Sequence, residues 1–207
     1  MSIMNELIIT KSVKKDLPVI LDIQKKAFLQ VARIFHLKTM PQIEQTLESI
    51  TEEFENGVFL KASIAFKAKP MSFRTHVRNL KVLNLLKSRF LASLRNDKKK
   101  IKAQPPRQND EDKIKMVGSV RAYKKADTCF IHRLVVLPEY QNKGIGKALM
   151  AVVEKRFRGQ VTRYELFTGS QDLRNLYFYN QLGYNAFKTE KHNDEISFVY
   201  LKKNIKD

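Results

Sequence analysis

The chain has 207 residues, of which 43% are hydrophobic, so it can bury a sizeable core and wholesale disorder is excluded. Lys and Arg total 39 against 21 acidic residues, and the resulting formal net charge of +18 favours acidic partners such as nucleotides, nucleic acid or an anionic membrane. A single Cys, Cys129, excludes an intramolecular disulfide and a Cys-rich zinc site.

Turn residues and the spacing of apolar residues divide the chain into helices and strands. In chain order we expect a strand over 6–12, helices over 16–35 and 40–57, strands over 58–66, 115–125 and 128–137, a helix over 146–157, a strand over 163–169, a helix over 170–183, and a closing hairpin over 184–190 and 195–203. Asp16 is the expected N-cap of the first helix, and Gly57 and Gly183 are expected to end two others. This order predicts a mixed α/β fold, a single domain over 1–207.

The length of the apolar stretches indicates the compartment in which the protein resides. No stretch is long enough for a signal peptide or for a membrane-spanning helix. We therefore expect a cytoplasmic protein.

The segment 67–113 is unusually basic, with 14 Lys and Arg against 4 acidic residues, a net +10 that leaves +8 for the rest of the chain. It interrupts the hairpin between the strands at 58–66 and 115–125. Its first part has apolar residues three and four apart, which predicts an amphipathic helix, and its second part is a polar, Pro-bearing linker. We favour packing on the domain or on a second subunit; binding to nucleic acid or to an anionic membrane remains the alternative.

The stretch PEYQNKGIGKALM, 138–150, places two glycines where a helix begins. The first amides of a helix have no partner within it, and they lie at the positive end of its dipole. Gly144 and Gly146 lack a Cβ, so an anion such as a phosphate or pyrophosphate can approach the main chain closely. A tight turn with no ligand is the alternative explanation of the same glycines.

With its neighbours, this turn resembles that of the GNAT family of N-acetyltransferases. The family pattern Q/R-x-x-G-x-G/A is filled by Gln141, Gly144 and Gly146, and the preceding strand pattern L-x-V-x-P is filled by Leu134, Val136 and Pro138. A second block of the family is matched by Asn175, Phe178, Tyr179, Gly183 and Tyr184. The resemblance covers about 1–66 and 114–205. The second block is similar to that of a bacterial branch of the family whose substrates are mostly unassigned.

The resemblance implies a GNAT fold and an acetyl-coenzyme A site. The pyrophosphate is expected on the turn formed by Gln141, Asn142, Lys143, Gly144, Ile145, Gly146 and Lys147. The pantetheine arm is expected between the strands at 128–137 and 163–169, bonded to the main chain of Leu134 and Val136. Asn175 is expected to contact the coenzyme, and Tyr179 to act as general acid toward its sulfur.

The general base is less well defined by the resemblance. The histone-type members carry a Glu at the position of Phe130, so that form of base catalysis is in doubt. His132 lies two residues further along the same strand face, where the serotonin N-acetyltransferase branch has a His, and it is our candidate base. Glu165 is a weaker candidate. The four scattered His and the single Cys give no metal-ligand spacing, so no metal is expected.

The expected reaction moves an acetyl group from acetyl-coenzyme A directly to a primary amine of a small molecule or an amino-acid-like acceptor. A protein N-terminus or lysine is the second choice of acceptor. A different class also remains open, a non-catalytic protein of the same fold that binds nucleic acid or membrane through 67–113. A homodimer is compatible with the sequence.

Overall fold

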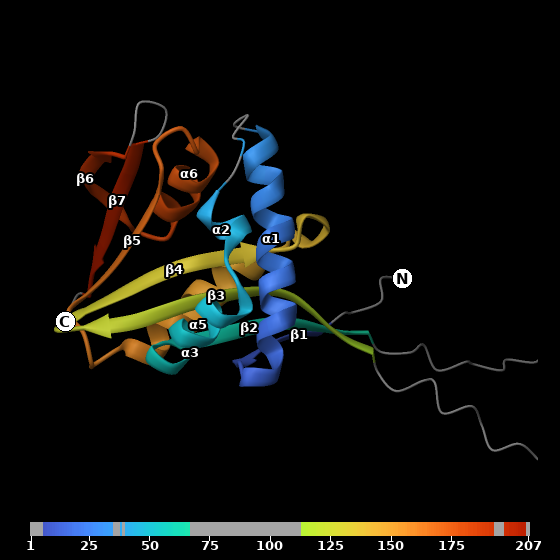
Figure 1. Ribbon diagram of the computed structural model, residues 1–207. Coiled ribbons are helices and arrows are strands. Elements are labelled where there is room, and N and C mark those ends of the chain that lie inside the picture. Colours follow the sequence, from blue (N-terminus) through green and yellow to red (C-terminus); the bar gives the residue numbers. More distant parts are fainter. Residues whose placement is uncertain (1–5, 35–37, 39, 67–112, 193–196, 206–207) are drawn as a thin grey trace, which may run out of the picture. The chain divides into compact units, whose positions relative to one another are not determined.

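A computed structural model describes residues 6–34, 38, 40–66, 113–192 and 197–205, and each structural statement below concerns these residues. Their helices and strands build a compact unit formed by Asn5–Ala65 and Ile114–Asp207 (Figure 1). The predicted amphipathic helix of the basic segment lies outside the described residues.

The order of elements confirms the mixed α/β fold. It is β1 (Glu6–Lys11), η1 (Lys14–Asp16), α1 (Leu17–Ile34), α2 (Pro41–Glu44), α3 (Leu47–Asn56), β2 (Val58–Phe66), β3 (Lys113–Lys125), β4 (Thr128–Val136), η2 (Pro138–Tyr140), α5 (Ile145–Phe157), β5 (Arg163–Gly169), α6 (Leu173–Gln181), β6 (Asn185–Lys191) and β7 (Ser197–Asn204). The strands are rich in β-branched and aromatic residues, as their extended conformation favours.

The strands form a seven-stranded sheet in the order β1-β2-β3-β4-β5-β7-β6 (Figure 1). The pairs β1/β2, β3/β4, β5/β7 and β6/β7 are antiparallel, whereas β4 and β5 run parallel. A single parallel pair in the middle of the sheet requires a crossover, and α5 provides it between β4 and β5.

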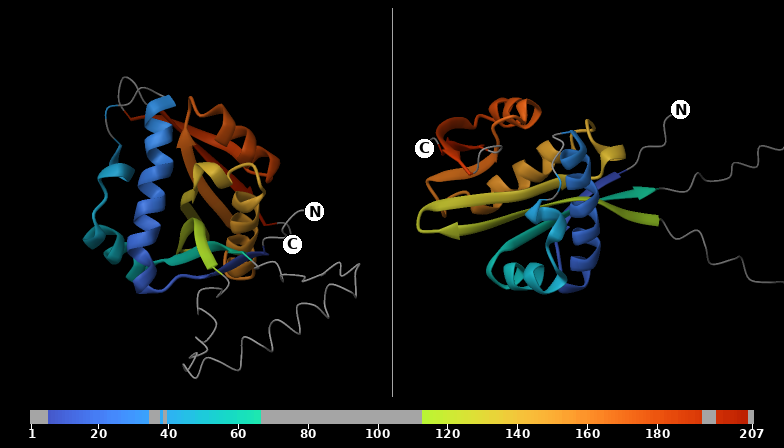
Figure 2. Two further views of the ribbon diagram at one scale, coloured as in Figure 1. Left: turned by 90° about the vertical axis from the view of Figure 1, so that its right-hand side faces the viewer. Right: turned by 45° about the horizontal axis from the view of Figure 1, so that its top comes forward.

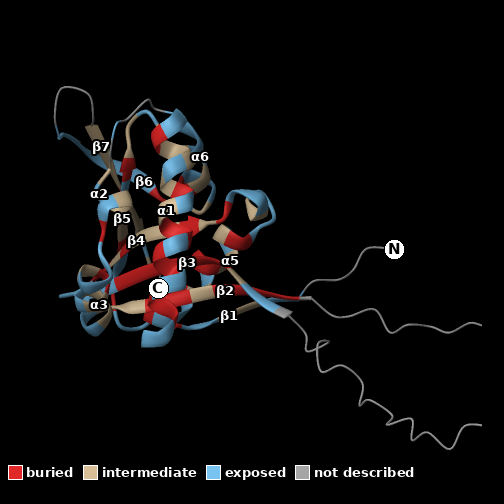
Figure 3. Ribbon diagram, turned by 45° about the vertical axis from the view of Figure 1, so that its right-hand side comes forward, coloured by how far each residue is buried: buried red, intermediate tan, exposed pale blue. Residues whose placement is uncertain are grey.

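Helices cover the two faces of the sheet, with α1 on one side and α5 on the other (Figure 2). Val135 of β4 packs in one core cluster with Ile23 and Ala27 of α1. Its neighbour in sequence, Leu134, faces the start of α5. Figure 3 shows buried residues along α1, β3 and β4, whereas β6 is exposed over its whole length. None of the described helices is long and apolar enough to cross a membrane.

The predicted helix over 40–57 is wrong in its continuity, because two helices occupy that range. Gln45, between α2 and α3, has a non-helical main chain with φ −52° and ψ 131°, and buries its side chain. Thr46 then caps α3, its hydroxyl accepting a hydrogen bond from the Ser49 amide at 3.2 Å. Tertiary hydrogen bonds of Gln45, described below, outweigh the local helix pattern.

Two predicted helix ends also differ in detail. Asp16 lies in the turn η1 before α1, where its carboxylate accepts hydrogen bonds from the Val13 amide at 2.8 Å and from Lys61 at 2.7 Å. It therefore ties the start of α1 to β2 instead of capping α1 directly. Gly57 ends α3 in an extended conformation, and a Cβ there would meet the Glu53 carbonyl oxygen at 3.1 Å. Close approach of the main chain explains this glycine.

Candidate active site

The parallel strands β4 and β5 are paired only at their beginnings. Three residues of β4, Thr128 to Phe130, pair with Arg163 to Glu165 of β5, and the two strands then continue without pairing to each other. The Leu137 amide bonds to Val117 of β3 at 2.8 Å, so alternation along β4 turns the main-chain groups of Val136 and Leu134 toward β5. This edge of β4 can therefore bind an extended ligand by hydrogen bonds, as an added strand would.

A β-bulge lies in β4 where the strands diverge. On β3, Ser119 pairs with Val135 and Arg121 with His132, so β4 contains one residue more than β3 between these pairs. The extra length includes Arg133, whose φ is +53°. That left-handed conformation costs a non-glycine residue about 1–2 kcal/mol, and the bulge bends β4 beyond its last pair with β5.

The turn before α5 has two residues in the left-handed conformation, Asn142 with φ +59° and Gly144 with φ +79°. Gly144 is the N-cap of α5 and supplies no side-chain cap. None of the main-chain amides from Asn142 to Lys147 donates a hydrogen bond to another residue of the described part of the chain. Six consecutive free amides at the positive end of a helix dipole form a site for an anion.

The side chains around this turn are partly committed to the protein. The side-chain nitrogen of Gln141 donates to the Val136 carbonyl at 3.0 Å, and the Lys143 side chain donates to the Glu139 carbonyl at 2.9 Å. Asn142 accepts a hydrogen bond from Arg174 of α6 at 3.0 Å. Arg174 therefore brings a positive charge to the turn, which sequence reasoning missed because it depends on where α6 packs.

The remaining residues of the turn differ in what they can present to a ligand. Ile145 is buried and can offer only its amide, whereas the Lys147 side chain is exposed. A Cβ on Gly146 would lie 3.4 Å from the Phe178 ring of α6 and 3.9 Å from Leu134. These are ordinary van der Waals distances, so packing alone does not require a glycine at this position, and the opening of the turn to an anion by Gly146 stays a prediction.

Tyr179 is buried on α6, with its ring against Phe178 and Tyr184. Burial, reinforced by the negative charge of Asp172, raises the pKa of the Tyr179 hydroxyl well above its ordinary value. The hydroxyl is therefore protonated at neutral pH, as a general acid must be before it acts.

Asn175 lies one helical turn before Tyr179 and is held at the start of α6. Asp172, the N-cap of α6, accepts hydrogen bonds from the Asn175 amide at 3.0 Å and from its side-chain nitrogen at 2.7 Å. The Asn175 side chain thereby has a fixed orientation, with its oxygen atom left for another partner.

His132 lies on β4 beside the bulge, with its ring 5.6 Å from that of Tyr123. Burial lowers the pKa of His132 to about 4, an effect that the charge of Glu53 only partly offsets. His132 is therefore neutral at pH 7 and a weak base. Glu165, at the last β4/β5 pair, accepts from Arg163 at 2.7 Å, so its carboxylate is already paired.

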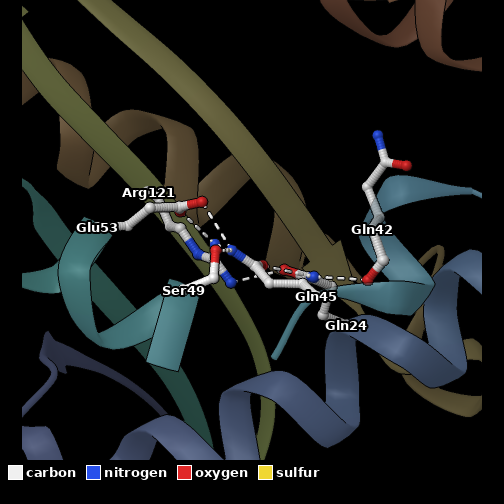
Figure 4. Close-up of polar contacts among 6 residues, drawn as sticks. All are labelled: Gln24, Gln42, Gln45, Ser49, Glu53 and Arg121. Carbon is white, nitrogen blue, oxygen red and sulfur yellow. Dashed lines mark hydrogen bonds and ion pairs between the residues drawn. The ribbon is translucent and has the colours of Figure 1, made fainter. Parts of the chain in front are cut away.

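A buried polar network, missed in the sequence, lies beneath this region (Figure 4). Arg121 of β3, only 1% exposed, donates to Glu53 at 2.5 Å, to Gln45 at 3.1 Å and to Gln24 at 2.6 Å. Gln24 in turn donates to the Gln42 carbonyl at 2.7 Å, and Gln45 to Glu53 at 2.7 Å. The network joins α1, α2 and α3 to β3 and holds a charge beneath the divergence of the strands.

The other strands near the divergence expose aromatic side chains. Phe167 of β5 is 47% exposed and contacts Phe198 and Tyr200 of β7, with ring centroids 5.2 and 5.6 Å away. Alternation along β5 puts Phe167 on the face of Glu165, opposite to Tyr164, which bonds to α5. This aromatic face suits a small organic ligand. Within the described ranges, no group of three or more His, Cys, Asp or Glu is placed to hold a metal ion.

The low pKa of His132 predicts a pH-dependent loss of stability. As the pH falls, His132 binds a proton near pH 6.5 in the unfolded state but only near pH 4 in the folded state. The contribution of His132 to the free energy of unfolding is therefore fully present above pH 6.5. It is lost as the pH falls toward 4, and the loss amounts to about 3 kcal/mol. Chemical denaturation at pH 7 and pH 4 should show a smaller loss for His132→Phe than for the wild type. An equal loss in both proteins would contradict the burial of His132; His192→Phe, an exposed position, controls for removal of an imidazole.

The fold and part of the sequence are similar to those of known proteins. Residues 92–184 match the model of the acetyltransferase (GNAT) family. No curated protein sequence matches the chain. Among solved structures, the chain is similar to the PaiA N-acetyltransferase from Thermoplasma acidophilum in complex with coenzyme A, with 15% identity, a TM-score of 0.61, and coverage of 97% of this chain and 99% of that chain.

Two further structures share the fold. The ribosomal-protein-S18-alanine N-acetyltransferase from Escherichia coli has 12% identity and a TM-score of 0.60 over 97% of this chain and 94% of that chain. A GNAT family acetyltransferase from Elizabethkingia anophelis with acetyl-CoA bound has 14% identity and a TM-score of 0.55 over 96% of this chain and 98% of that chain. Residues 92–184, which contain the Gln141–Gly146 turn and α6, thus match the GNAT family of acetyltransferases, and the chain shares its fold with solved acetyltransferases.

Proposed function

We propose that the protein is an N-acetyltransferase that moves the acetyl group of acetyl-coenzyme A directly to a primary amine of a small, amino-acid-like acceptor. The observation that carries the proposal is the row of six free amides, 142–147, at the uncapped start of α5, next to the edge of β4 that β5 leaves unpaired. Solved structures of the same fold contain coenzyme A or acetyl-CoA.

Each part of the coenzyme has a matching part of the protein in this proposal. The amides from Asn142 to Lys147 bind the pyrophosphate, with Arg174 and Lys147 adding positive charge. The main-chain groups of Leu134 and the main-chain amide of Val136 bind the pantetheine arm along β4, since the Val136 carbonyl already accepts a hydrogen bond from the Gln141 side chain. Asn175 orients the part of the coenzyme nearest to α6. The protein thereby holds the thioester at the divergence of β4 and β5.

The chemical step needs a neutral amine, which attacks the thioester carbonyl to form a C–N bond. The C–S bond then breaks, Tyr179 donates its proton to the leaving sulfur, and the resulting tyrosinate regains a proton from water. His132, neutral at pH 7, passes the proton of the amine to water and does not retain it, because its pKa is about 4. Most of the acceleration comes from positioning, since a thioester is already activated.

A small acceptor is favoured over a polybasic protein segment. The net charge of +18 repels lysine-rich tails and polyamines, and the aromatic face of Phe167, Phe198 and Tyr200 suits a compact organic molecule. The test is release of free coenzyme A thiol with a panel of small amines, with the acetylated amine identified by mass spectrometry. Turnover with lysine-bearing peptides and with no small amine would contradict the proposed acceptor class.

A negative charge introduced at Gly144 tests the proposed phosphate site. Asn and Asp both tolerate the left-handed conformation of this residue, and nothing lies within 4 Å of a Cβ placed there. Gly144→Asp puts a negative charge beside the bound pyrophosphate, whereas Gly144→Asn has the same shape without the charge. The Kd for acetyl-coenzyme A, measured by calorimetry, should be at least about fivefold higher for Gly144→Asp, since like charges 4 Å apart cost about 1 kcal/mol even in water. Equal Kd values for the two variants would place the phosphates elsewhere.

A further inference from the structure

Arg133 has a main-chain conformation that costs free energy, and the residue lies next to the proposed reaction site. It occupies the bulge of β4 with a φ of +53°, just beyond the last β4/β5 pair. Arginine has no special tolerance of this conformation, unlike glycine or asparagine. Strained residues of this kind cluster where a side chain must be aimed at a ligand.

The Arg133 side chain contains a buried polar atom without a hydrogen-bond partner. Its Nε is buried and makes no hydrogen bond, and no ion pair joins the side chain to another residue within the described part of the chain. Burial lowers the pKa of Arg133, with the charge of Glu53 partly offsetting the effect. A guanidinium that has lost much of its water and has no carboxylate of its own is a binding group for an external anion.

Arg121, Arg133 and Glu53 together carry one positive charge in excess. Arg121 is 1% exposed, has its own unpaired Nε, and feels the repulsion of Arg133. Glu53 is bonded to Arg121 and is the acidic group whose charge acts on both arginines. Two guanidinium groups thus share one carboxylate, because His132 is neutral at pH 7. A ligand with a single negative charge completes the balance.

We propose that Arg133 binds the carboxylate of the acceptor, so that the substrate is an amine that also carries a carboxylate, an amino acid or a close relative of one. The inference rests on the proposed acetyl transfer and names its substrate class. The planar guanidinium fork matches a carboxylate, and the single excess charge matches one carboxylate better than a phosphate dianion. The proposed site of the coenzyme phosphates is at the start of α5, which lies on the other side of the sheet from α1, one of the helices joined by the Glu53–Arg121 network (Figure 2).

The test compares acceptors that differ only in the carboxylate. A panel of α- and ω-amino acids is assayed beside the carboxamide of each, at saturating acetyl-coenzyme A, and kcat and KM are determined separately. The wild type should prefer the acid to its carboxamide by roughly 10- to 100-fold in kcat/KM, the factor that a hydrogen bond to a charged group supplies. Arg133→Gln should raise KM for the acid and leave the carboxamide unchanged, so that the preference disappears.

Two other variants separate binding from folding. Arg133→Gly relieves the left-handed strain, so its thermal midpoint should be no lower than that of the wild type while its preference for the acid is lost. Arg158→Gln removes an exposed arginine at the end of α5 and should keep the full preference.

Calorimetry with acetyl-coenzyme A distinguishes the ways in which this inference can fail. Equal use of acids and carboxamides by the wild type, with normal coenzyme binding, would overturn the role of Arg133 and leave acetyl transfer intact. A uniform loss with both acceptors in Arg133→Gln would assign Arg133 a structural role and also overturn it. Absence of coenzyme binding in the wild type would overturn the acetyltransferase proposal together with this inference.

Discussion

Tyr179→Phe should lower kcat by about 10²- to 10⁴-fold, the usual contribution of a general acid, and leave the Kd for acetyl-coenzyme A nearly unchanged. Phe retains the ring that packs against Phe178 and Tyr184 and removes only the hydroxyl. Because burial raises the pKa of that hydroxyl, the wild type should not lose activity through its ionisation in mildly alkaline buffer. Stopped-flow or steady-state assays of thiol release measure the change in kcat.

Tyr177→Phe is the matched control for this prediction. Tyr177 lies on the same helix but is 69% exposed, so removal of its hydroxyl should leave kcat as in the wild type. If Tyr179→Phe turns over normally at every pH, the assignment of Tyr179 as general acid is wrong. A loss of coenzyme affinity with kcat retained would give Tyr179 a binding role instead.

Glu53→Ala should lower the free energy of unfolding by about 3 kcal/mol. Arg121 is buried, and removal of its carboxylate partner leaves an uncompensated charge, which usually costs 3–5 kcal/mol. The lower end applies because the Glu53 side chain is 32% exposed and water can partly replace it. For a chain of this size the thermal midpoint should fall by roughly 6–12 °C, as measured by circular dichroism.

Glu55→Ala and a double variant control for this effect. Glu55 lies on the same helix, pairs with Lys14 at 3.6 Å and is 63% exposed, so its removal should cost less than 1 kcal/mol. The double variant Glu53→Leu/Arg121→Met removes both charges, and it should be more stable than Glu53→Ala alone. A double variant as unstable as Glu53→Ala would mean that lost packing or the lost hydrogen bonds of Arg121 to Gln24 and Gln45, and not the unpaired charge, explain the destabilisation.

The local features of the fold were predictable because their causes are local. Apolar periodicity placed the helices and strands, and Gly183 ends α6 with a φ of +86°, as its position indicated. Gly144 adopts the left-handed conformation in the turn before α5 that the glycine spacing suggested. The splay of β4 and β5, expected from the family resemblance, is present in their pairing.

The features that were missed depend on residues far apart in the sequence. The break at Gln45 follows from bonds to Gln24 and Arg121, 21 and 76 residues away. Arg174 reaches Asn142 across 32 residues once α6 has packed beside the turn. No local pattern marks Arg133 as a bulge residue either, because the bulge appears only when β3 and β4 pair. Such features become visible only with the sheet assembled.

Calorimetric titration of the wild-type protein with acetyl-coenzyme A tests the central claim most directly. The account predicts one molecule bound per chain, with affinity weakened in Gly144→Asp relative to Gly144→Asn. Ligand at a hundred times its Kd should also raise the free energy of unfolding by about 2.7 kcal/mol. Absence of binding at millimolar coenzyme would contradict the assignment of the 142–147 amides and of the β4 edge as an acetyl-coenzyme A site.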